Sequence, residues 1–348
     1  MPERSPGDGF VVTRTPFRVS FFGGGTDYPA WYRAHGGAVL STTIDKYCYV
    51  ALRRLAPIFD YRFRVVHSKI EQVRAAAEIE HPMIRAVLER AAPGGGLELH
   101  QVGDVQTGTG LGASSAFTVG LLNALDALAG RPVPREVLAR QAIGIEQDVV
   151  LEAVGSQDQI AAAYGGFNHI VFHADDRFEV APLALPAERL AALQDRLLLY
   201  FTGFARHAAG VARATIDNLP WRQPELRRMA EMVGEALALL RDPDAPLDAF
   251  GALLDEHWQL KRRLSPNVST PEIDGIYAAA MGAGALGGKL LGAGGGGVLL
   301  LFAEPGEQAR LRERLKHLVE LPFRFERTGS RVISVSDAER AGMRVPSG

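Results

Sequence analysis

The chain has 348 residues, of which 47% are hydrophobic and 22% charged, and its net charge of −2 is ordinary for a globular protein with room for two hydrophobic cores. The balanced charge, without any Lys/Arg block, argues against nucleic acid as a partner, and no apolar run approaches the roughly twenty residues that span a membrane. The single cysteine, Cys48, excludes an intrachain disulfide and a cysteine-based zinc site, and without a signal-peptide pattern we expect a cytoplasmic protein.

The first half of the chain combines short strand patterns with helices. A loose N-terminus is followed by strands predicted at 11–14, 17–22, 40–55, 61–67, 97–102 and 165–172. Helices are predicted at 29–35, 80–91, 113–129, 134–151 and 156–164, and residues 183–192 as a connection with some helix.

The second half is richer in long helices. They are predicted at 207–218, 224–240, 247–264, 271–282 and 306–318. Strands are predicted at 196–201, 289–291 and 298–302, and near Phe323 and Val332. This change of character predicts an α+β fold of two domains, residues 10–195 and 196–340.

The most informative segment is residues 104–117, DVQTGTGLGASSAF, which leads directly into a predicted helix. Gly108, Gly110 and Gly112 permit a tight backbone turn, and a helix that begins there directs unpaired N–H groups at the loop. Such a turn binds phosphate, and the hydroxyls of Ser114 and Ser115 are oxygen ligands of the kind that magnesium accepts. The segment therefore predicts a nucleotide-phosphate site at residues 107–116.

Three other interpretations compete for this loop. A dinucleotide-binding fingerprint has the spacing G-x-G-x-x-G, and here the third glycine comes one residue too early. A Walker A loop has Ser or Thr after Gly-Lys, and in this chain Leu290 follows the only Gly-Lys pair, Gly288-Lys289. A glycine-containing tight turn without function stays open from this loop alone.

Two further segments reduce that alternative. They are residues 15–29, TPFRVSFFGGGTDYP, and residues 289–302, KLLGAGGGGVLLLF. In order and spacing, the three motifs resemble those of the GHMP kinase superfamily, over residues 12–333. The resemblance implies a two-domain α+β fold with the active site between the domains, ATP and Mg²⁺ as cofactors, and a small-molecule acceptor. The triple glycine of the first motif resembles the branch that holds bacterial heptose 7-phosphate kinases and fucokinase domains.

The resemblance also assigns the cofactor site. Ser115 and Glu146 correspond to magnesium ligands, with a helix N-cap and a solvated surface carboxylate as their structural alternatives. The nearby Asp148 and Glu152 are expected to be surface charges. The residues implied in ATP binding are Thr107, Gly108, Gly110, Leu111, Gly112, Ala113, Ser114 and Ser115.

Two residues are implied in catalysis. Asp158, twelve positions after Glu146, lies in a segment that resembles the base-bearing turn of these kinases, where the aspartate accepts or orients the acceptor proton. Arg18 occupies the cation position of the first motif and would stabilise developing charge. A helix N-cap for Asp158 and a strand-surface arginine for Arg18 are the structural alternatives.

The acceptor site is implied by the same comparison. A phosphorylated sugar needs extra cations, and Arg206 and Lys261 are the candidates, the latter on one helix face with His257. Lys289 is a weaker candidate for a phosphate contact. The glycines of the third motif are expected to pack beside the phosphate loop. The complete set of expected substrate residues is Gly24, Gly25, Thr26, Asp27, Arg206, Lys261, Gly294 and Gly295.

The sequence thus favours an ATP- and Mg²⁺-dependent kinase of a sugar or sugar phosphate. The expected acceptor is the anomeric hydroxyl of D-glycero-α-D-manno-heptose 7-phosphate, for nucleotide-activated heptose and surface polysaccharide. The alternatives are an anomeric kinase of an unphosphorylated sugar such as L-fucose, a non-catalytic sugar sensor, and a dehydrogenase, which the glycine spacing disfavours.

Overall fold

The computed structural model describes residues 9–91, 93–203 and 208–336, whose strands form two sheets. The larger sheet has nine strands, with β13, β1, β2, β5, β3 and β4 in that order, while β12 and β6 also pair with β2, and β7 pairs with β6. Every pairing is antiparallel except that of β3 with β5. The strands are β1 (Phe10–Phe22), β2 (Gly37–Leu55), β3 (Phe63–Val66), β4 (Ile70–Val73), β5 (Gly96–Gly103), β6 (Phe167–Phe172), β7 (Phe178–Pro182), β12 (Phe325–Glu326) and β13 (Arg331–Ser336).

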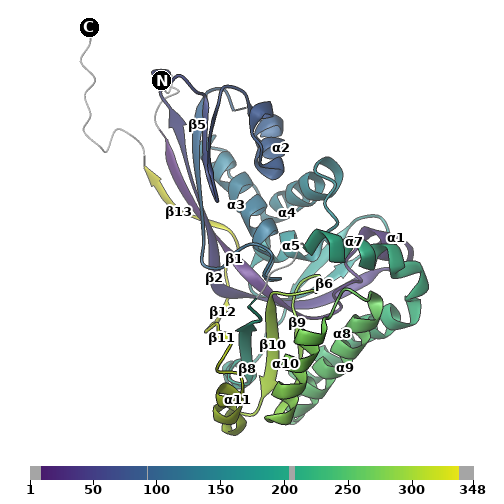
Figure 1. Cartoon of the computed structure of the whole chain (residues 1–348). Coiled ribbons are helices and arrows are strands. Elements are labelled where there is room, and N and C mark those ends of the chain that lie inside the picture. The colour runs from purple at the N-terminus through teal and green to yellow at the C-terminus, as the bar shows by residue number, and fades with distance from the viewer. Residues whose placement is uncertain (1–8, 92, 204–207, 337–348) are drawn as a thin grey trace.

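Helices cover one face of this sheet (Figure 1). They are α2 (Pro82–Ala91), α3 (Ala113–Leu128), α4 (Arg135–Gly144) and α5 (Gln157–Tyr164), and α1 (Pro29–His35) joins β1 to β2. Helix α3 contacts both β1 and β2, and its side chains from Ala116 to Leu122 are buried because apolar residues occupy nearly every turn. The helix that follows the phosphate loop is therefore fixed to the longest strands of the molecule.

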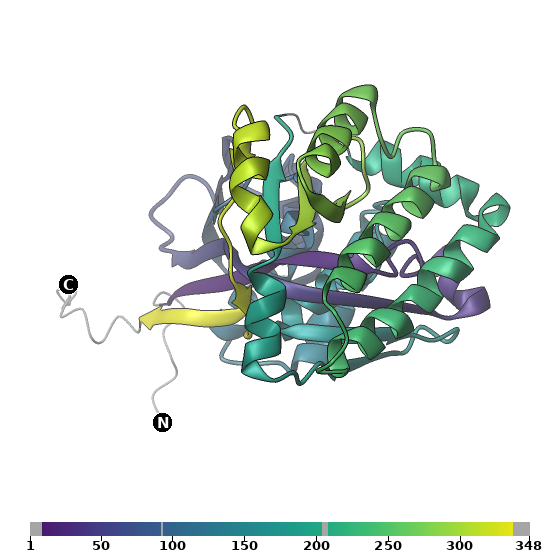
Figure 2. The same ribbon diagram turned by 90° about the horizontal axis from the view of Figure 1, so that it is seen from below.

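The smaller sheet has the order β11, β8, β10, β9 and is antiparallel throughout. Its strands are β8 (Leu197–Phe201), β9 (Ala285–Leu290), β10 (Val298–Ala303) and β11 (Val319–Glu320). The helices of this half are α6 (Ala187–Gln194), α7 (Ala208–Asn218), α8 (Gln223–Arg241), α9 (Asp248–Leu264), α10 (Pro271–Gly282) and α11 (Gln308–Arg314). Figure 2 shows α8 and α9 lying across the long strands β1 and β2.

Aromatic side chains of the two halves pack against each other next to the first glycine motif. Phe21 and Phe22, the last residues of β1, contact Phe250 of α9 with ring centroids 5.5 and 5.1 Å apart in edge-to-face geometry. Such pairs contribute about 0.5–1.5 kcal/mol each beyond the burial of their area. The turn that begins at Gly23 is thus anchored by side chains from both halves.

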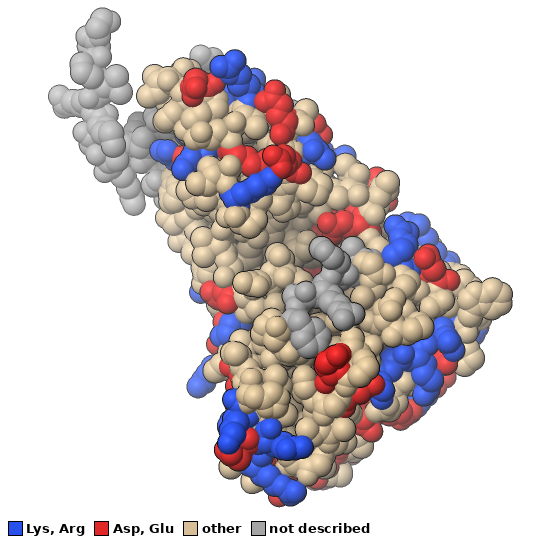
Figure 3. All heavy atoms as spheres, viewed as in Figure 1, with Lys and Arg blue, Asp and Glu red and all other residues tan. Residues whose placement is uncertain are grey.

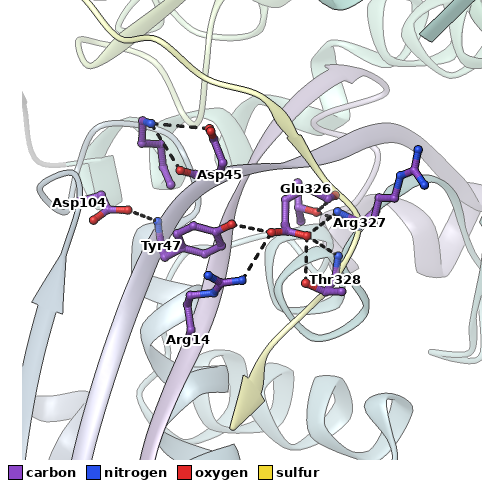
Figure 4. A network of polar contacts seen from close by, with 10 residues as sticks. Arg14, Asp45, Tyr47, Asp104, Glu326, Arg327 and Thr328 are labelled. Atoms are coloured by element: carbon purple, nitrogen blue, oxygen red, sulfur yellow. Dashed lines mark hydrogen bonds and ion pairs between the residues drawn. The ribbon is translucent and has the colours of Figure 1, made fainter. Parts of the chain in front are cut away.

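The last two strands return to the larger sheet. Figure 4 shows Glu326 of β12 accepting hydrogen bonds from the Tyr47 hydroxyl and from the amide and hydroxyl of Thr328, with Arg14 at ion-pair distance. Burial alone would raise the pKa of Glu326, but these donors lower it to about 2. The division into residues 10–195 and 196–340 stays a prediction, since β12 and β13 belong to the sheet of the first half.

Charged side chains of both signs are interspersed on the face seen in Figure 3. Within the described residues, no helix is long and apolar enough to cross a membrane. Cys48 is buried, and burial raises its thiol pKa to about 12, so that the thiol stays protonated.

Most elements predicted from sequence occur, and the following ones differ. The strands expected at 11–14 and 17–22 are one strand, β1, whose pairing with β2 shifts register after Pro16, a residue without an N–H to donate. Strands β4, β7 and β11 were not predicted, and β9 begins at Ala285, four residues before the strand expected at 289–291. The helix expected at 134–151 ends as α-helix at Gly144 and continues as a π-helix, Ile145–Val149. The helix expected at 306–318 is shorter because a 3₁₀ turn, Pro305–Glu307, precedes it.

Candidate active site

The phosphate loop lies between the two sheets and is bonded to one strand of each. Gly112 has the left-handed backbone φ of 75° and immediately precedes α3, whose first residues line a cavity of about 370 Å³. The amide of Arg18 donates to the carbonyl of Leu111 at 2.9 Å, and the amide of Val298 donates to that of Thr109 at 2.9 Å. No side chain caps α3 at Gly112, so the N–H groups of its first turn, which have no partner within a helix, are available to a phosphate at the cavity wall.

The third glycine motif packs directly on this loop. A Cβ atom on Gly110 would lie 2.5 Å from the carbonyl oxygen of Leu291, and one on Gly292 would lie 2.5 Å from the Cα atom of Gly110. The prediction that this motif packs beside the phosphate loop is therefore confirmed. Gly292 and Ala293 line the cavity, whereas Gly294 packs against the backbone of Val268 and is not part of the cavity wall. Gly295, whose amide donates to the Val268 carbonyl at 2.9 Å, is likewise absent from the cavity wall.

Arg18 and Asp158 form a paired cation and carboxylate in the cavity. The Nε and Nη2 atoms of Arg18 donate to the two carboxylate oxygens of Asp158 at 2.8 and 2.6 Å, and Nη1 donates to the carbonyl of Gly110. The side chain of Arg18 is 6% exposed and that of Asp158 is 24% exposed, so Asp158 keeps access to a ligand. Asp158 is in the first turn of α5, but its carboxylate bonds Arg18 and does not cap the helix.

Ser115 and Glu146 meet at the start of α3. The Ser115 hydroxyl donates to Oε2 of Glu146 at 2.8 Å, and Nε2 of Gln159 donates to the same oxygen at 2.5 Å. The other oxygen, Oε1, is buried without a hydrogen-bond partner in the described structure, and burial raises the pKa of Glu146 to about 7. A hydroxyl beside a carboxylate with a free oxygen fits the donor set of Mg²⁺, so these two residues suit a cation bound with the nucleotide phosphates.

The first motif forms the opposite wall. Oδ1 of Asp27 accepts the amide of Gly25 at 2.9 Å, and Oδ2 accepts Nε2 of Gln157 at 2.9 Å. The hydroxyl of Thr26 donates to the carbonyls of Gly23 and Ala38 at 2.7 and 2.9 Å, so Thr26 stabilises the turn and does not reach the cavity wall. Burial raises the pKa of Asp27.

Two polar atoms without hydrogen-bond partners belong to the same wall. Ser20 and Gln157 flank Gly24, and both line the cavity. The Ser20 hydroxyl and Oε1 of Gln157 are buried and have no hydrogen-bond partner among the described residues. Because such atoms are costly to leave unpaired, they suit a ligand rich in hydroxyl groups.

Two buried lysines complete the floor of the cavity. Nζ of Lys261 donates to the carbonyls of Leu290 and Gly292 at 2.7 and 2.6 Å, and Nζ of Lys289 donates to that of Phe21 at 2.8 Å. Burial, with the positive charge of Arg18 nearby, lowers the pKa of Lys261 to about 7, and burial lowers that of Lys289 well below its usual range. In its protonated form each side chain has three N–H donors, more than the one or two carbonyls it bonds here, and a bound anion would favour that form.

The site can now be compared with known proteins. Residues 68–166 match the GHMP kinases N terminal domain and residues 236–320 match the GHMP kinases C terminal domain, together more than half of the chain. The chain belongs to the GHMP kinases. It is 29% identical to a D-glycero-alpha-D-manno-heptose 7-phosphate kinase of Campylobacter jejuni, over 88% of this chain and 93% of that protein.

A second GHMP relative is the bifunctional fucokinase/GDP-fucose pyrophosphorylase of Arabidopsis thaliana, 27% identical over 88% of this chain but only 31% of that longer protein. Among solved structures, a D-glycero-D-manno-heptose 1-phosphate kinase from Bacteroides thetaiotaomicron has a TM-score of 0.76 at 22% identity, covering 93% of this chain and 99% of that one. The expected two-domain α+β GHMP fold and the kinase class are thus confirmed, with ATP as the family's phosphoryl donor.

Within this GHMP kinase, the individual site assignments remain predictions that the geometry supports unequally. The cavity wall includes Thr107, Gly108, Gly110, Gly112, Ala113, Ser114, Ser115, Gly24, Gly25, Asp27, Asp158, Arg18 and Lys261. Leu111 is buried and contributes its carbonyl to Arg18. Glu146 is buried behind Ser115, and Arg206 lies outside the described residues.

Sequence reasoning misplaced Glu152 and missed several cavity residues, among them two with polar side chains. Glu152 was expected to be a surface charge, but it lines the cavity, and burial raises its pKa. Ser20 and Gln157 were not singled out, although Gln157 directly precedes Asp158 in the base-like turn. That adjacency was the one signal available from the sequence.

Proposed function

We propose that this GHMP kinase transfers the γ-phosphoryl group of ATP, with Mg²⁺, to the anomeric hydroxyl of D-glycero-α-D-manno-heptose 7-phosphate. The product is the 1,7-bisphosphate, for the synthesis of nucleotide-activated heptose and surface polysaccharide. The observation that carries the reaction is the Arg18 guanidinium, which bonds both oxygens of Asp158 and also reaches the carbonyl of Gly110. One side chain thereby joins the base candidate to the phosphate loop.

The nucleotide side supplies positioning. Phosphoryl transfer depends mainly on holding the phosphates in line and neutralising charge. The N–H groups at the start of α3 bind the phosphates, and Ser115 and Glu146 hold the divalent cation, which when bound neutralises charge on the β- and γ-phosphates.

The acceptor side supplies the nucleophile. The sugar lies against Gly24 and Asp27, where Ser20 and Gln157 offer unpaired polar atoms to its hydroxyl groups. Asp158 orients the anomeric hydroxyl and accepts its proton as the bond to phosphorus forms, while Arg18 stabilises the charge that develops on the transferred group.

The phosphorylated acceptor is supported by two observations. The heptose 7-phosphate kinase described above is 29% identical to this chain over 88% of this chain and 93% of that protein. The cavity also contains two buried amines, Lys261 and Lys289, beyond the Arg18–Asp158 pair. Arg206 stays a predicted ligand of the 7-phosphate from its motif.

A free sugar is the second candidate. Besides the plant protein, an L-fucokinase/L-fucose-1-P guanylyltransferase of Bacteroides fragilis is 26% identical over 88% of this chain, although the match covers only 36% of that protein. An anomeric kinase of L-fucose would use the same nucleotide loop and the same Asp158.

A sugar panel with coupled ADP detection tests this proposal. The panel contains heptose 7-phosphate, mannose 6-phosphate, mannose, galactose and L-fucose, each with ATP and Mg²⁺. We expect turnover on heptose 7-phosphate well above that on every other sugar. Turnover on L-fucose alone would assign the second function, and silence on all five despite bound ATP would contradict both.

A further inference from the structure

Glu152 has an unusual setting that the proposed reaction does not use. It follows the π-helix Ile145–Val149 and lines the cavity together with the next residues of the chain. Its neighbour Leu151 has a φ of 59° and a side chain that is 68% exposed. A left-handed conformation is unfavourable for a non-glycine residue, and such strain is concentrated at functional sites.

Backbone hydrogen bonds fix the main chain at Glu152. The amide of Glu152 donates to the carbonyl of Glu146 at 2.8 Å, and the amide of Val154 donates to the carbonyl of Glu152 at 3.0 Å. After the π-helix, the chain therefore returns so that the backbone of Glu152 lies beside that of Glu146. The Glu152 side chain itself makes no hydrogen bond or ion pair with any residue of the described ranges.

The environment of Glu152 favours a cation as its partner. The backbone of Glu152 bonds that of Glu146, whose Oε1 is buried without a hydrogen-bond partner among the described residues. Ser114 and Ser115 line the same cavity. Two carboxylates beside one phosphate loop repel each other and the nucleotide, unless a divalent cation lies between them.

We propose that Glu152 is an outer carboxylate of the divalent-cation site, which contacts the cation of the nucleotide complex through water while Ser115 and Glu146 contact it directly. The proposal rests on the metal site of the proposed function and not on the identity of the acceptor. In this role Glu152 is a positioning residue. Outer groups of this kind typically change metal affinity by 10- to 100-fold when they are removed.

Binding of Mn²⁺, measured by electron paramagnetic resonance with a non-hydrolysable ATP analogue and no acceptor, tests this role. We expect Glu152→Gln to weaken Mn²⁺ binding by roughly tenfold and Glu152→Asp, which keeps the charge, to weaken it less. Asp148→Asn is the matched control, because Asp148 is an exposed carboxylate on the same π-helix, and its Mn²⁺ affinity should equal that of the unmodified protein.

The outcomes separate this proposal from the others. Unchanged Mn²⁺ affinity in Glu152→Gln, with a higher KM for the acceptor, would make Glu152 an acceptor ligand and overturn the proposal. Unchanged affinity in Glu152→Gln and in Glu146→Gln alike would overturn the metal site as a whole. Because the titration contains no acceptor, a silent sugar panel leaves its result valid.

Discussion

The two walls of the cavity are built in different ways. On the nucleotide side, backbone atoms form the surface: Gly110 and Gly112 have left-handed φ values of 84° and 75°, and Gly110 has no room for a Cβ atom. On the acceptor side, buried side chains form it, among them Asp27, Gln157 and Lys261. A backbone surface binds any polyphosphate of the correct shape, whereas a surface of buried polar side chains discriminates among ligands, because each wrong ligand leaves groups unpaired.

If one wall binds the nucleotide and the other selects the acceptor, replacing Asp158, which lies between them, should have the largest effect. Asp158→Asn removes the charge that Arg18 bonds, and we expect kcat to fall by roughly 10²–10⁴ with the affinity for an ATP analogue unchanged. Steady-state kinetics and calorimetric titration measure the two quantities. Near-normal turnover would remove Asp158 from the mechanism.

A change confined to the acceptor wall should affect the acceptor alone. In Asp27→Asn the amide cannot replace the charged oxygens, and we expect KM for the sugar to rise roughly tenfold or more while KM for ATP stays constant. Initial rates with each substrate varied in turn measure both constants, with the exposed Asp148→Asn as control. A rise in the ATP KM instead would show that the walls are not separate.

A change in the nucleotide wall should act through the backbone. Gly110→Ala places a methyl group against the Leu291 carbonyl at a left-handed φ, and we expect a loss of roughly 1–3 kcal/mol in unfolding free energy together with weaker ATP binding. Gly234→Ala in α8 is the control, since its Cβ atom meets nothing within 4 Å, and it should be neutral or stabilising by up to about 1 kcal/mol. Equal effects of the two substitutions would disprove the tight loop contact.

The buried amines of the acceptor wall predict a change that is gradual at any one pH, a dependence of stability on pH. Between pH 7 and 10.5, Lys261 is neutral in the folded protein but protonated in the unfolded chain. The unfolded state then binds more protons, so the stability of the protein relative to Lys261→Met should rise with pH in this window, by at most about 1.4 kcal/mol per unit.

Urea denaturation at several pH values measures this slope. The exposed residue Lys316, paired with Glu313, supplies the control, and Lys316→Met should run parallel to the unmodified protein. A Lys261→Met curve that is also parallel would mean that Lys261 stays charged in the cavity.

The same contrast explains what could be predicted from the sequence. The phosphate loop and its packing on the third motif were predictable because glycine is required locally, and the requirement is visible in one segment of sequence. Thr26 and Gly294 could not be separated from their neighbours Asp27 and Gly292, since only the folded turn decides which of them faces the cavity.

Other features could not be predicted from the sequence either, because they depend on the folded backbone or on residues far away in the chain. Glu152 resembles any helical surface glutamate until the π-helix and the left-handed Leu151 turn it inward. The strands β4 and β7 are short pieces at the end of a strand path, and they are defined by pairing with β3 and β6 more than by their own composition. Lys261 lies on a helix predicted almost to the residue and Lys289 on a strand predicted four residues too late, but the burial of both follows only from how the two sheets meet.

The position of the new phosphate is the most direct test of the whole account. Phosphorus NMR of the product formed from heptose 7-phosphate, ATP and Mg²⁺ should show two sugar phosphate signals, one of them coupled to the anomeric proton. A second phosphate coupled to any other proton, or inorganic phosphate as the only product, would contradict the assignment of this chain as an anomeric kinase.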